Sequence, residues 1–174
     1  MDYARAMEIA KDKGDTSLIR RLTANGEPPY YGKNVTLKSA VYLNYLTSYM
    51  ARNPDIHNPG YNTFRDISSS EYGLLDKINF FRGVINTYNH VYQQLYDIDM
   101  RIGYTKIDVP VYFFLGRYDV NAPTVLVEEY ERILEAPDKR IVWFEHSGHS
   151  PWINERDKFI EEVILCFLKI DSRQ

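Results

Sequence analysis

Two short apolar runs constrain the fold of this chain more than any other feature. Residues 109–115 (VPVYFFL) and 140–144 (RIVWF) contain almost no polar side chains, as is typical of strands buried on both faces of a sheet. Between them we expect a helix that begins near Pro123 and ends before Ala136-Pro137. A strand–helix–strand unit of this length implies parallel strands joined by a right-handed crossover. The sequence therefore predicts the α/β fold class, with an amphipathic closing helix over 159–168.

Two strands do not make a complete sheet. A parallel pair this apolar leaves an edge and much of a face unpaired unless further strands are added. We therefore expect another part of the protein or another chain to complete the sheet. For the same reason we expect the free chain to self-associate, as a homo-oligomer or by swapping elements.

The residues before position 106 have a different pattern, dominated by helical periodicity and tyrosine. Helices are expected over 2–13, over 16–25 with Asp15 or Thr16 as its cap, over 36–52, and over 74–99 with a cap in 68–71. The chain has 15 tyrosines, and they crowd between Tyr30 and Tyr118. Such a stretch suits a ligand cavity or an interface, and it equally suits ordinary core filling by long helices.

Composition and charge exclude several classes of function. The net charge of −3 gives no reason to expect nucleic acid or an anionic membrane as a partner. No apolar run approaches the ~20 residues of a membrane span, and the N-terminus lacks the apolar core of a signal peptide. The single cysteine, Cys166, lies among apolar residues, so we expect a buried structural thiol and a cytoplasmic protein. We expect neither a cofactor nor a metal ion.

Residues that could carry chemistry follow each expected strand. Asp119 lies in the loop after the first strand, and His149 lies in the loop after the second. Because the carboxyl ends of parallel strands meet at one edge of a sheet, we expect these two side chains to lie close together. A carboxylate bound to one imidazole nitrogen fixes the tautomer and leaves the other nitrogen to act as general base. The joint pattern of strand, Gly-x-x-Asp, helix, strand and Gly-His makes Asp119 and His149 the candidate catalytic residues.

The remaining histidines have other expected roles. His146 competes with His149, but the small residues Ser147 and Gly148 leave His149 at the freer loop position. His57 and His90 are expected to be surface or cavity residues without a catalytic role.

Four segments of the chain resemble a known family. Residues 110–119 and 143–151 are similar to the acid and histidine segments of α/β-hydrolases, and most of all to the proline iminopeptidase-like branch. Residues 26–30 and 70–79 look like stretches of the helical cap in bacterial members of that branch. The resemblance covers nearly the whole chain and implies an α/β-hydrolase fragment.

The resemblance also implies a nucleophile that this sequence lacks. Such enzymes carry their serine on a G-x-S-x-G turn before the cap, followed by the acid and then the histidine. No G-x-S-x-G occurs here, and the segment that forms the oxyanion hole is also missing. We therefore expect the chain to begin at the cap, with a helical cap over 1–105. The last two parallel strands and helices of the core sheet are expected in 106–174, and the N-terminal half with the serine lies outside.

For the complete enzyme, the resemblance implies a serine hydrolase acting on an ester or amide in a small molecule or peptide. Proline iminopeptidase-like aminopeptidase activity is one form of this, and the chain alone is expected to be inactive. In aminopeptidase relatives, acidic side chains of the cap recognise the free amino group of the substrate. Glu71, Asp76 and Asp97 are available, but the sequence singles out none, and we expect solvated helix charges.

Two other interpretations remain open. In one, the chain is a non-catalytic binding or assembly module that uses its aromatic helical surface as an interface. In the other, Ser147 or Ser150 is the nucleophile, although a loop beside His149 lacks the strained strand-to-helix turn that such a serine needs. A serine-bearing partner segment separates the hydrolase from the binding module.

Overall fold

The computed structural model describes residues 1–58 and 60–171. Within these residues the chain divides into two compact units. Unit 1 comprises Met1–Thr47 and Tyr61–Ile98, and unit 2 comprises the described part of Ser48–Gly60 and Asp99–Gln174. The boundary that the sequence suggests at residue 105 remains a prediction.

Unit 1 is helical, and α3 runs on from it into the first residues of unit 2. Its elements are α1 (Asp2–Asp12), α2 (Thr16–Asn25), η1 (Gly32–Asn34), α3 (Val35–Met50), α4 (Thr63–Ile67), α5 (Leu74–His90) and η2 (Tyr92–Leu95).

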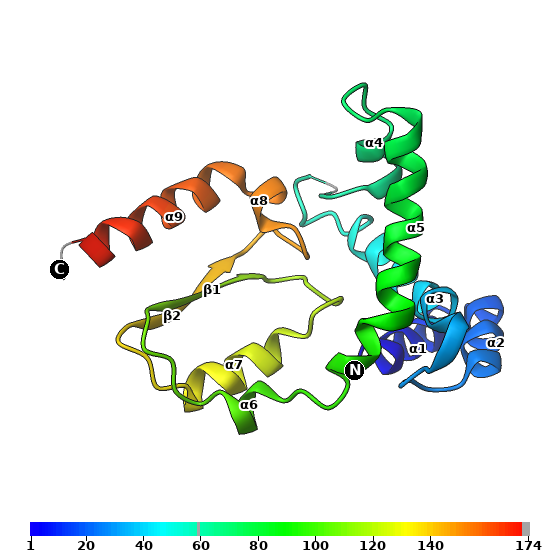
Figure 1. The fold of residues 1–174 in the computed structure, drawn as a ribbon, viewed down its shortest axis with the longest axis horizontal. Helices are drawn as coiled ribbons and strands as arrows, with labels where there is room; N and C mark the ends of the chain where they lie inside the picture. The colour runs from blue at the N-terminus through cyan, green and yellow to red at the C-terminus, as the bar shows by residue number, and fades with distance from the viewer. Residues whose placement is uncertain (59, 172–174) are drawn as a thin grey trace. The chain divides into compact units, whose positions relative to one another are not determined.

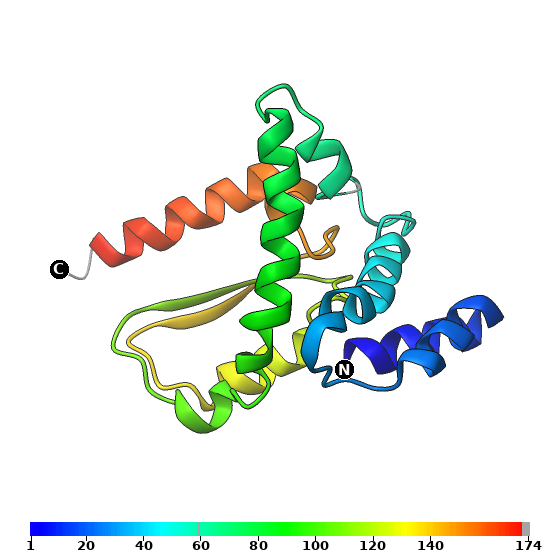
Figure 2. The same ribbon diagram turned by 45° about the vertical axis from the view of Figure 1, so that its right-hand side comes forward.

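Helices α1 and α2 form a pair, and they lie side by side in both ribbon views (Figures 1 and 2). Asp15 is the cap of α2, since its carboxylate accepts a hydrogen bond of 2.9 Å from the Leu18 N–H. The Tyr3 hydroxyl donates to the Leu22 carbonyl at 3.1 Å and ties the two helices together. Ala6 is completely buried within this pair. The two predicted N-terminal helices are thus present, and Asp15 rather than Thr16 caps the second.

Tyrosines fill much of the core of unit 1. Tyr3, Tyr30 and Tyr42 are buried, and the rings of Tyr3 and Tyr42 meet edge to face at 6.3 Å. The Tyr96 hydroxyl donates to the Tyr30 carbonyl at 2.9 Å. For these residues the core-filling interpretation of the tyrosine-rich stretch applies.

Helix α5 begins at Leu74, where the predicted helix over 74–99 begins, but its predicted cap in 68–71 and its predicted length are wrong. Gly73 precedes the first residue of α5, and its N–H donates to the Asp76 carboxylate at 3.0 Å. Because Asp76 satisfies this exposed N–H from within the helix, the serines at 68–70 are not needed as a cap. The helical run also breaks after His90 into η2 and a non-helical turn.

Unit 2 contains a parallel sheet that has two strands in the part of the chain that the structure describes. Its elements are α6 (Met100–Gly103), β1 (Val111–Gly116), α7 (Thr124–Ile133), β2 (Lys139–Phe144), α8 (Pro151–Asn154) and α9 (Arg156–Asp171). The pairing begins at Val111 opposite Lys139 and ends at Gly116 opposite Phe144, so both strands end together. The predicted parallel pair is confirmed, and helices around it are compatible with the α/β class.

Helices α7 and α9 cover opposite faces of this sheet (Figure 1). Phe113 meets Tyr130 of α7 with ring centroids 6.0 Å apart, whereas Phe114 meets Phe159 of α9 at 5.2 Å. Neighbouring strand residues point to opposite faces, which places one helix on each side. Cys166 of α9 is buried, as predicted.

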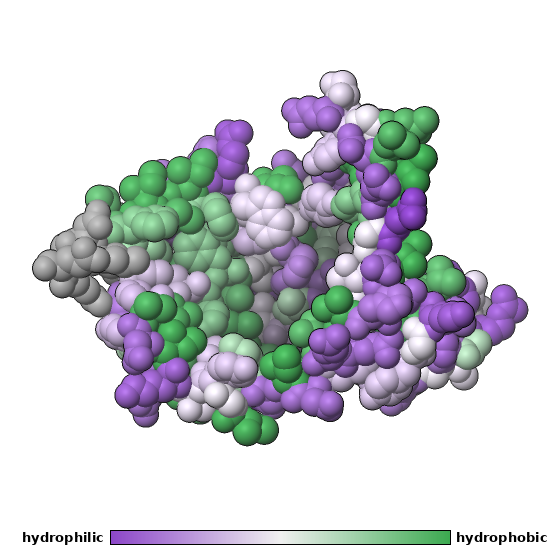
Figure 3. Space-filling model, viewed as in Figure 1, coloured by the Kyte–Doolittle hydropathy of each residue, from purple (hydrophilic) through white to green (hydrophobic). Residues whose placement is uncertain are grey.

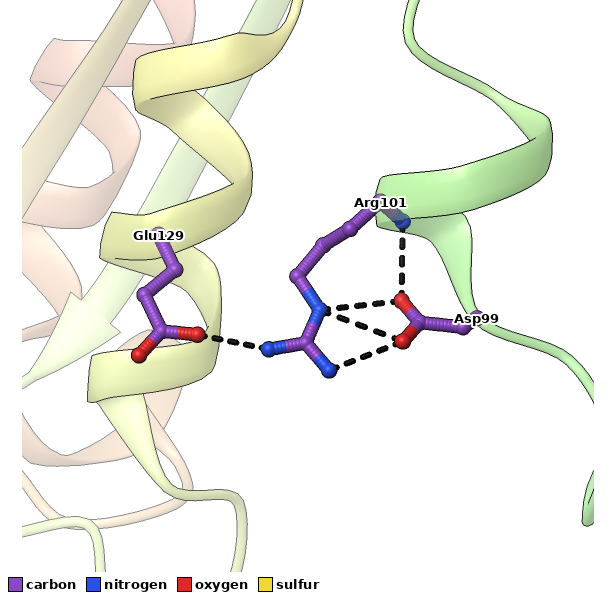
Figure 4. Close-up of polar contacts among 3 residues, drawn as sticks. All are labelled: Asp99, Arg101 and Glu129. Carbon is purple, nitrogen blue, oxygen red and sulfur yellow. Dashed lines mark hydrogen bonds and ion pairs between the residues drawn. The ribbon is translucent and has the colours of Figure 1, made fainter.

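An ion cluster joins α6 to α7 (Figure 4). The Arg101 guanidinium donates to the Asp99 carboxylate at 2.8 Å and to Glu129 of α7 at 2.6 Å. The hydrogen bond from Arg101 holds the pKa of Asp99 below its usual value. All three side chains are well exposed, so the cluster adds little stability.

The outer surface of α9 is apolar, and green side chains gather over this helix in Figure 3. Ile160, Ile164, Leu165, Phe167 and Leu168 each expose between 48% and 65% of their surface.

In residues 1–58 and 60–171, no helix combines the length and the hydropathy that crossing a membrane requires.

Candidate active site

The first candidate residue, Asp119, lies in the turn that follows β1. Its backbone N–H donates to the Gly116 carbonyl at 3.2 Å. Its Oδ1 accepts hydrogen bonds from the N–H groups of Asn121 at 2.8 Å and Ala122 at 3.0 Å. These bonds fix one carboxylate oxygen to the turn and orient the side chain, which is only 11% exposed.

The second oxygen of the same carboxylate meets the second candidate residue. The distance from Asp119 Oδ2 to His149 Nδ1 is 2.8 Å. Since an ionised carboxylate only accepts hydrogen bonds, Nδ1 carries the proton, and Nε2 is the basic nitrogen of a neutral ring. The structure thus brings together the two residues that the sequence singles out, although their catalytic role remains a prediction.

The loops that carry Asp119 and His149 touch through two glycines. An added Cβ at Gly116 would lie 1.9 Å from the Gly148 carbonyl oxygen and 2.6 Å from that of Ser147. Just beyond this point the Tyr118 N–H donates to the Ser147 carbonyl at 3.0 Å. The missing side chain at Gly116 therefore allows the main chains of the two loops to come into contact.

A second link between the loops is an arginine on an aromatic ring. The Arg117 guanidinium makes two hydrogen bonds of 2.8 Å to Glu145, and it lies 3.8 Å from the centroid of the Trp143 ring. The hydrogen bonds from Arg117 lower the pKa of the Glu145 carboxyl. Both ionic groups are exposed, so the pair acts mainly through its fixed two-point geometry.

The histidine loop is also held by the turn between α8 and α9. Glu155 accepts hydrogen bonds from the His146 N–H at 2.8 Å and from the Ser147 hydroxyl at 2.6 Å. Asn154 accepts one from the Gly148 N–H at 3.2 Å. Ser147 is fully buried, and Ser150 is 6% exposed at the N-cap of α8. Neither serine is presented as a nucleophile would need to be, which argues against the interpretation that uses them.

The other histidines lie in two different places. In unit 1, His90 Nδ1 lies 2.9 Å from the Asn86 carbonyl oxygen at the end of α5. In unit 2, the His57 ring stacks on the His146 ring, with centroids 4.0 Å apart and planes 18° apart. Sequence reasoning assigned no role to His57, and a partner 89 positions further along the chain gave no signal of this contact.

The three acidic candidates of the helical region are exposed. Asp76 accepts the hydrogen bond that begins α5, while Glu71 and Asp97 lie on the surface of unit 1. The structure therefore favours none of them as the group that would bind a substrate amine. In the described part of the chain, no three His, Cys, Asp or Glu side chains cluster in a way that could hold a metal ion.

Sequence comparisons relate part of the chain to two hydrolases. A stretch of 96 residues, 55% of the chain, is 32% identical to the probable aminopeptidase YbaC of Bacillus subtilis (strain 168) and covers 30% of it. A stretch of 69 residues, 40% of the chain, is 30% identical to the pimeloyl-[acyl-carrier protein] methyl ester esterase of Aliivibrio fischeri (strain ATCC 700601 / ES114) and covers 26% of it.

These matches span less than a third of the length of either relative. No family model matches the chain, and no solved structure matches it significantly. An aminopeptidase and an esterase share the hydrolytic cleavage of an acyl bond. The similarity therefore connects the chain with a hydrolase-like family, over part of its length.

Proposed function

We propose that this chain supplies the acid and the histidine of a serine hydrolase of the α/β-hydrolase type. The nucleophile in this proposal is a serine on a segment outside the 174 residues. The reaction is acyl transfer from an ester or amide to water, and Asp119 and His149 are the catalytic residues.

One observation carries the proposal, namely the hydrogen bond of 2.8 Å between Asp119 Oδ2 and His149 Nδ1. The two residues follow parallel strands that end at the same level, and this is the edge of such sheets where functional groups gather. Similarity to an aminopeptidase and an esterase points to the same class of chemistry.

The chemistry follows from the orientation of the imidazole. As the serine attacks the carbonyl carbon, its proton passes to Nε2 of His149, and the ring becomes an imidazolium. Asp119 stabilises this cation through the hydrogen bond to Nδ1 and keeps the ring in the productive tautomer. The proton then moves from Nε2 to the leaving group, and water repeats the sequence to release the acid.

The proposal places the serine elsewhere for two reasons. No G-x-S-x-G occurs in the sequence, and the two serines nearest His149 are buried. The apolar outer surface of α9 and the two-stranded sheet are also what a part of a larger sheet protein would show.

The first experiment determines the coding sequence that precedes codon 1 and expresses the longest in-frame product. We expect it to contain a strand, a G-x-S-x-G turn and a helix, and to react with a fluorophosphonate probe for active serines. His149→Ala and Asp119→Asn should each reduce ester or aminopeptidase turnover by about 10³- to 10⁴-fold. His90→Ala, on α5 of unit 1, is the matched control and should leave turnover unchanged.

The same experiment separates the proposal from its rivals. Absence of any serine turn upstream of codon 1 would overturn it. Turnover by the 174-residue chain alone that disappears in His149→Ala would instead place the nucleophile within this sequence.

The binding-module interpretation has one observation in its favour. Helix α5 has no buried residue, and Leu74, Leu75, Ile78 and Phe81 expose between 38% and 76% of their surface. That interpretation requires the longest in-frame product to remain unreactive toward fluorophosphonate.

A further inference from the structure

A short segment after α3 touches both loops of the candidate site. This segment, residues 51–58, is called the strap below. It belongs to unit 2 together with the loops after β1 and β2. Sequence reasoning gave it no function.

The first contact of the strap is with the histidine loop. The His57 ring stacks on the His146 ring at 4.0 Å, and His146 Nδ1 lies 3.1 Å from the Asp55 carbonyl oxygen. Because a carbonyl oxygen only accepts, Nδ1 of His146 carries the proton and donates to Asp55. Both the plane and the direction of the His146 ring are thus fixed from the strap.

The second contact of the strap is with the loop of the catalytic acid. The Asp55 carboxylate interacts with the Tyr118 side chain and raises the pKa of its hydroxyl. Tyr118 immediately precedes Asp119. Asp55 therefore meets the histidine loop with its carbonyl and the acid loop with its carboxylate.

The third contact is made around Gly148. The Ile56 Cδ1 lies 3.3 Å from the position that a Cβ of Gly148 would take, and the sulfur of Met50, the residue just before the strap, lies 3.1 Å from it. The Asn58 carbonyl accepts a hydrogen bond from Asn154, whose Oδ1 binds the Gly148 N–H. A glycine has wide conformational freedom, and here its freedom is limited from two sides.

We propose that the strap is a positioning device for His149, with His57 and Asp55 as its positioning residues. The His149 side chain is 51% exposed, so the path of its loop decides where the ring lies. His146, three residues earlier, is the point where the strap holds that path. That the strap aids catalysis rests on the proposed function. That the strap maintains the Asp119–His149 hydrogen bond does not depend on that function.

The test begins with the 174-residue chain and needs no activity. Long-range ¹H–¹⁵N spectra of the imidazole nitrogens report the tautomer and hydrogen bonding of His149. His57→Ala should move the His149 signals toward those of Asp119→Asn, in which the acceptor is changed. His57→Phe keeps a flat ring on His146 and should retain the wild-type signals.

Two further variants keep the result interpretable. Tyr118→Phe removes only the hydroxyl that interacts with Asp55. It should shift the His149 signals in the same direction as His57→Ala, and it provides the test even if His57→Ala fails to fold. His90→Ala, whose ring lies on α5, should shift none of them. Unchanged His149 signals in folded His57→Ala or in Tyr118→Phe would overturn the inference.

The longest in-frame product then tests whether positioning serves catalysis. We expect His57→Ala to lower kcat about tenfold or more with little change in KM, because misplaced catalytic groups slow the chemical step. His57→Phe should restore kcat. Shifted His149 signals without any serine-dependent turnover would refute the proposed function alone, and unchanged signals in an active enzyme would refute the strap alone.

Discussion

Gly116 and Gly148 bring the two loops of the candidate site into main-chain contact. A Cβ on Gly116 would lie 1.9 Å from the Gly148 carbonyl oxygen, and the backbone of Gly116 has no positive φ that would require glycine. Space alone therefore excludes a side chain at this position. Any residue larger than glycine must push the histidine loop away from the loop of Asp119.

Gly116→Ala should destabilise the protein and separate the candidate pair. We expect a loss of about 2 kcal/mol or more in the free energy of unfolding, since a methyl group cannot fit without backbone movement. Urea unfolding measures the loss. Gly83→Ala is the control, because the site within α5 is open and alanine favours helix, which predicts a gain of about 0.5–1 kcal/mol. Equal stability of the two variants would contradict the crowding at Gly116.

Glu155→Ala should destabilise the histidine loop. The carboxylate accepts hydrogen bonds from the Ser147 hydroxyl and the His146 N–H, and Ser147 is completely buried. Leaving a buried hydroxyl without its acceptor costs about 1–3 kcal/mol. The control is Asp157→Ala, two residues further along the chain. The Asp157 side chain is 85% exposed, so this variant should change the free energy of unfolding by less than about 0.5 kcal/mol. A similar small effect for Glu155→Ala would show that solvent replaces the carboxylate.

Particular residues show how far the sequence predicts this structure. The parallel strands follow from uninterrupted apolar runs, and the meeting of Asp119 and His149 follows from the fact that both strands end together. The strap does not follow, because the contact of His57 with His146 depends on tertiary packing across 89 positions. The cap of α5 was wrongly predicted in 68–71, because Asp76 accepts the hydrogen bond of the Gly73 N–H from inside the helix.

High pH should destabilise unit 1 through Tyr30. This ring is 4% exposed, its hydroxyl donates to the Gly26 carbonyl at 2.7 Å, and burial raises its pKa to about 12. The folded state thus holds the proton more tightly than the unfolded state, whose tyrosines titrate at about 10. The contribution of Tyr30 to the free energy of unfolding is therefore fully present below a pH of about 10, and it is lost as the pH rises toward 12.

Urea unfolding on either side of the ordinary tyrosine pKa measures this effect. Tyr30→Phe should show a shallower loss of stability with rising pH than the wild type, and a part of the loss should remain because burial also raises the pKa of Tyr92 to about 12. The control is Tyr31→Phe, since that neighbouring side chain is 69% exposed and should leave the pH dependence unchanged. An identical slope in Tyr30→Phe and wild type would contradict the assignment.

The apolar surface of α9 should make the isolated chain self-associate. Ile164, Phe167 and Leu168 are each more than half exposed, and such a patch on one helix favours contact with another apolar surface. Sedimentation velocity should therefore show a sedimentation coefficient that rises with protein concentration. The double variant Phe167→Lys, Leu168→Glu should keep a sedimentation coefficient closer to that of the monomer. Arg156→Gln, which changes an exposed side chain at the start of α9, is the control and should associate as the wild type does. A concentration-independent monomer in the wild type would mean that these side chains are tolerated in water without a partner.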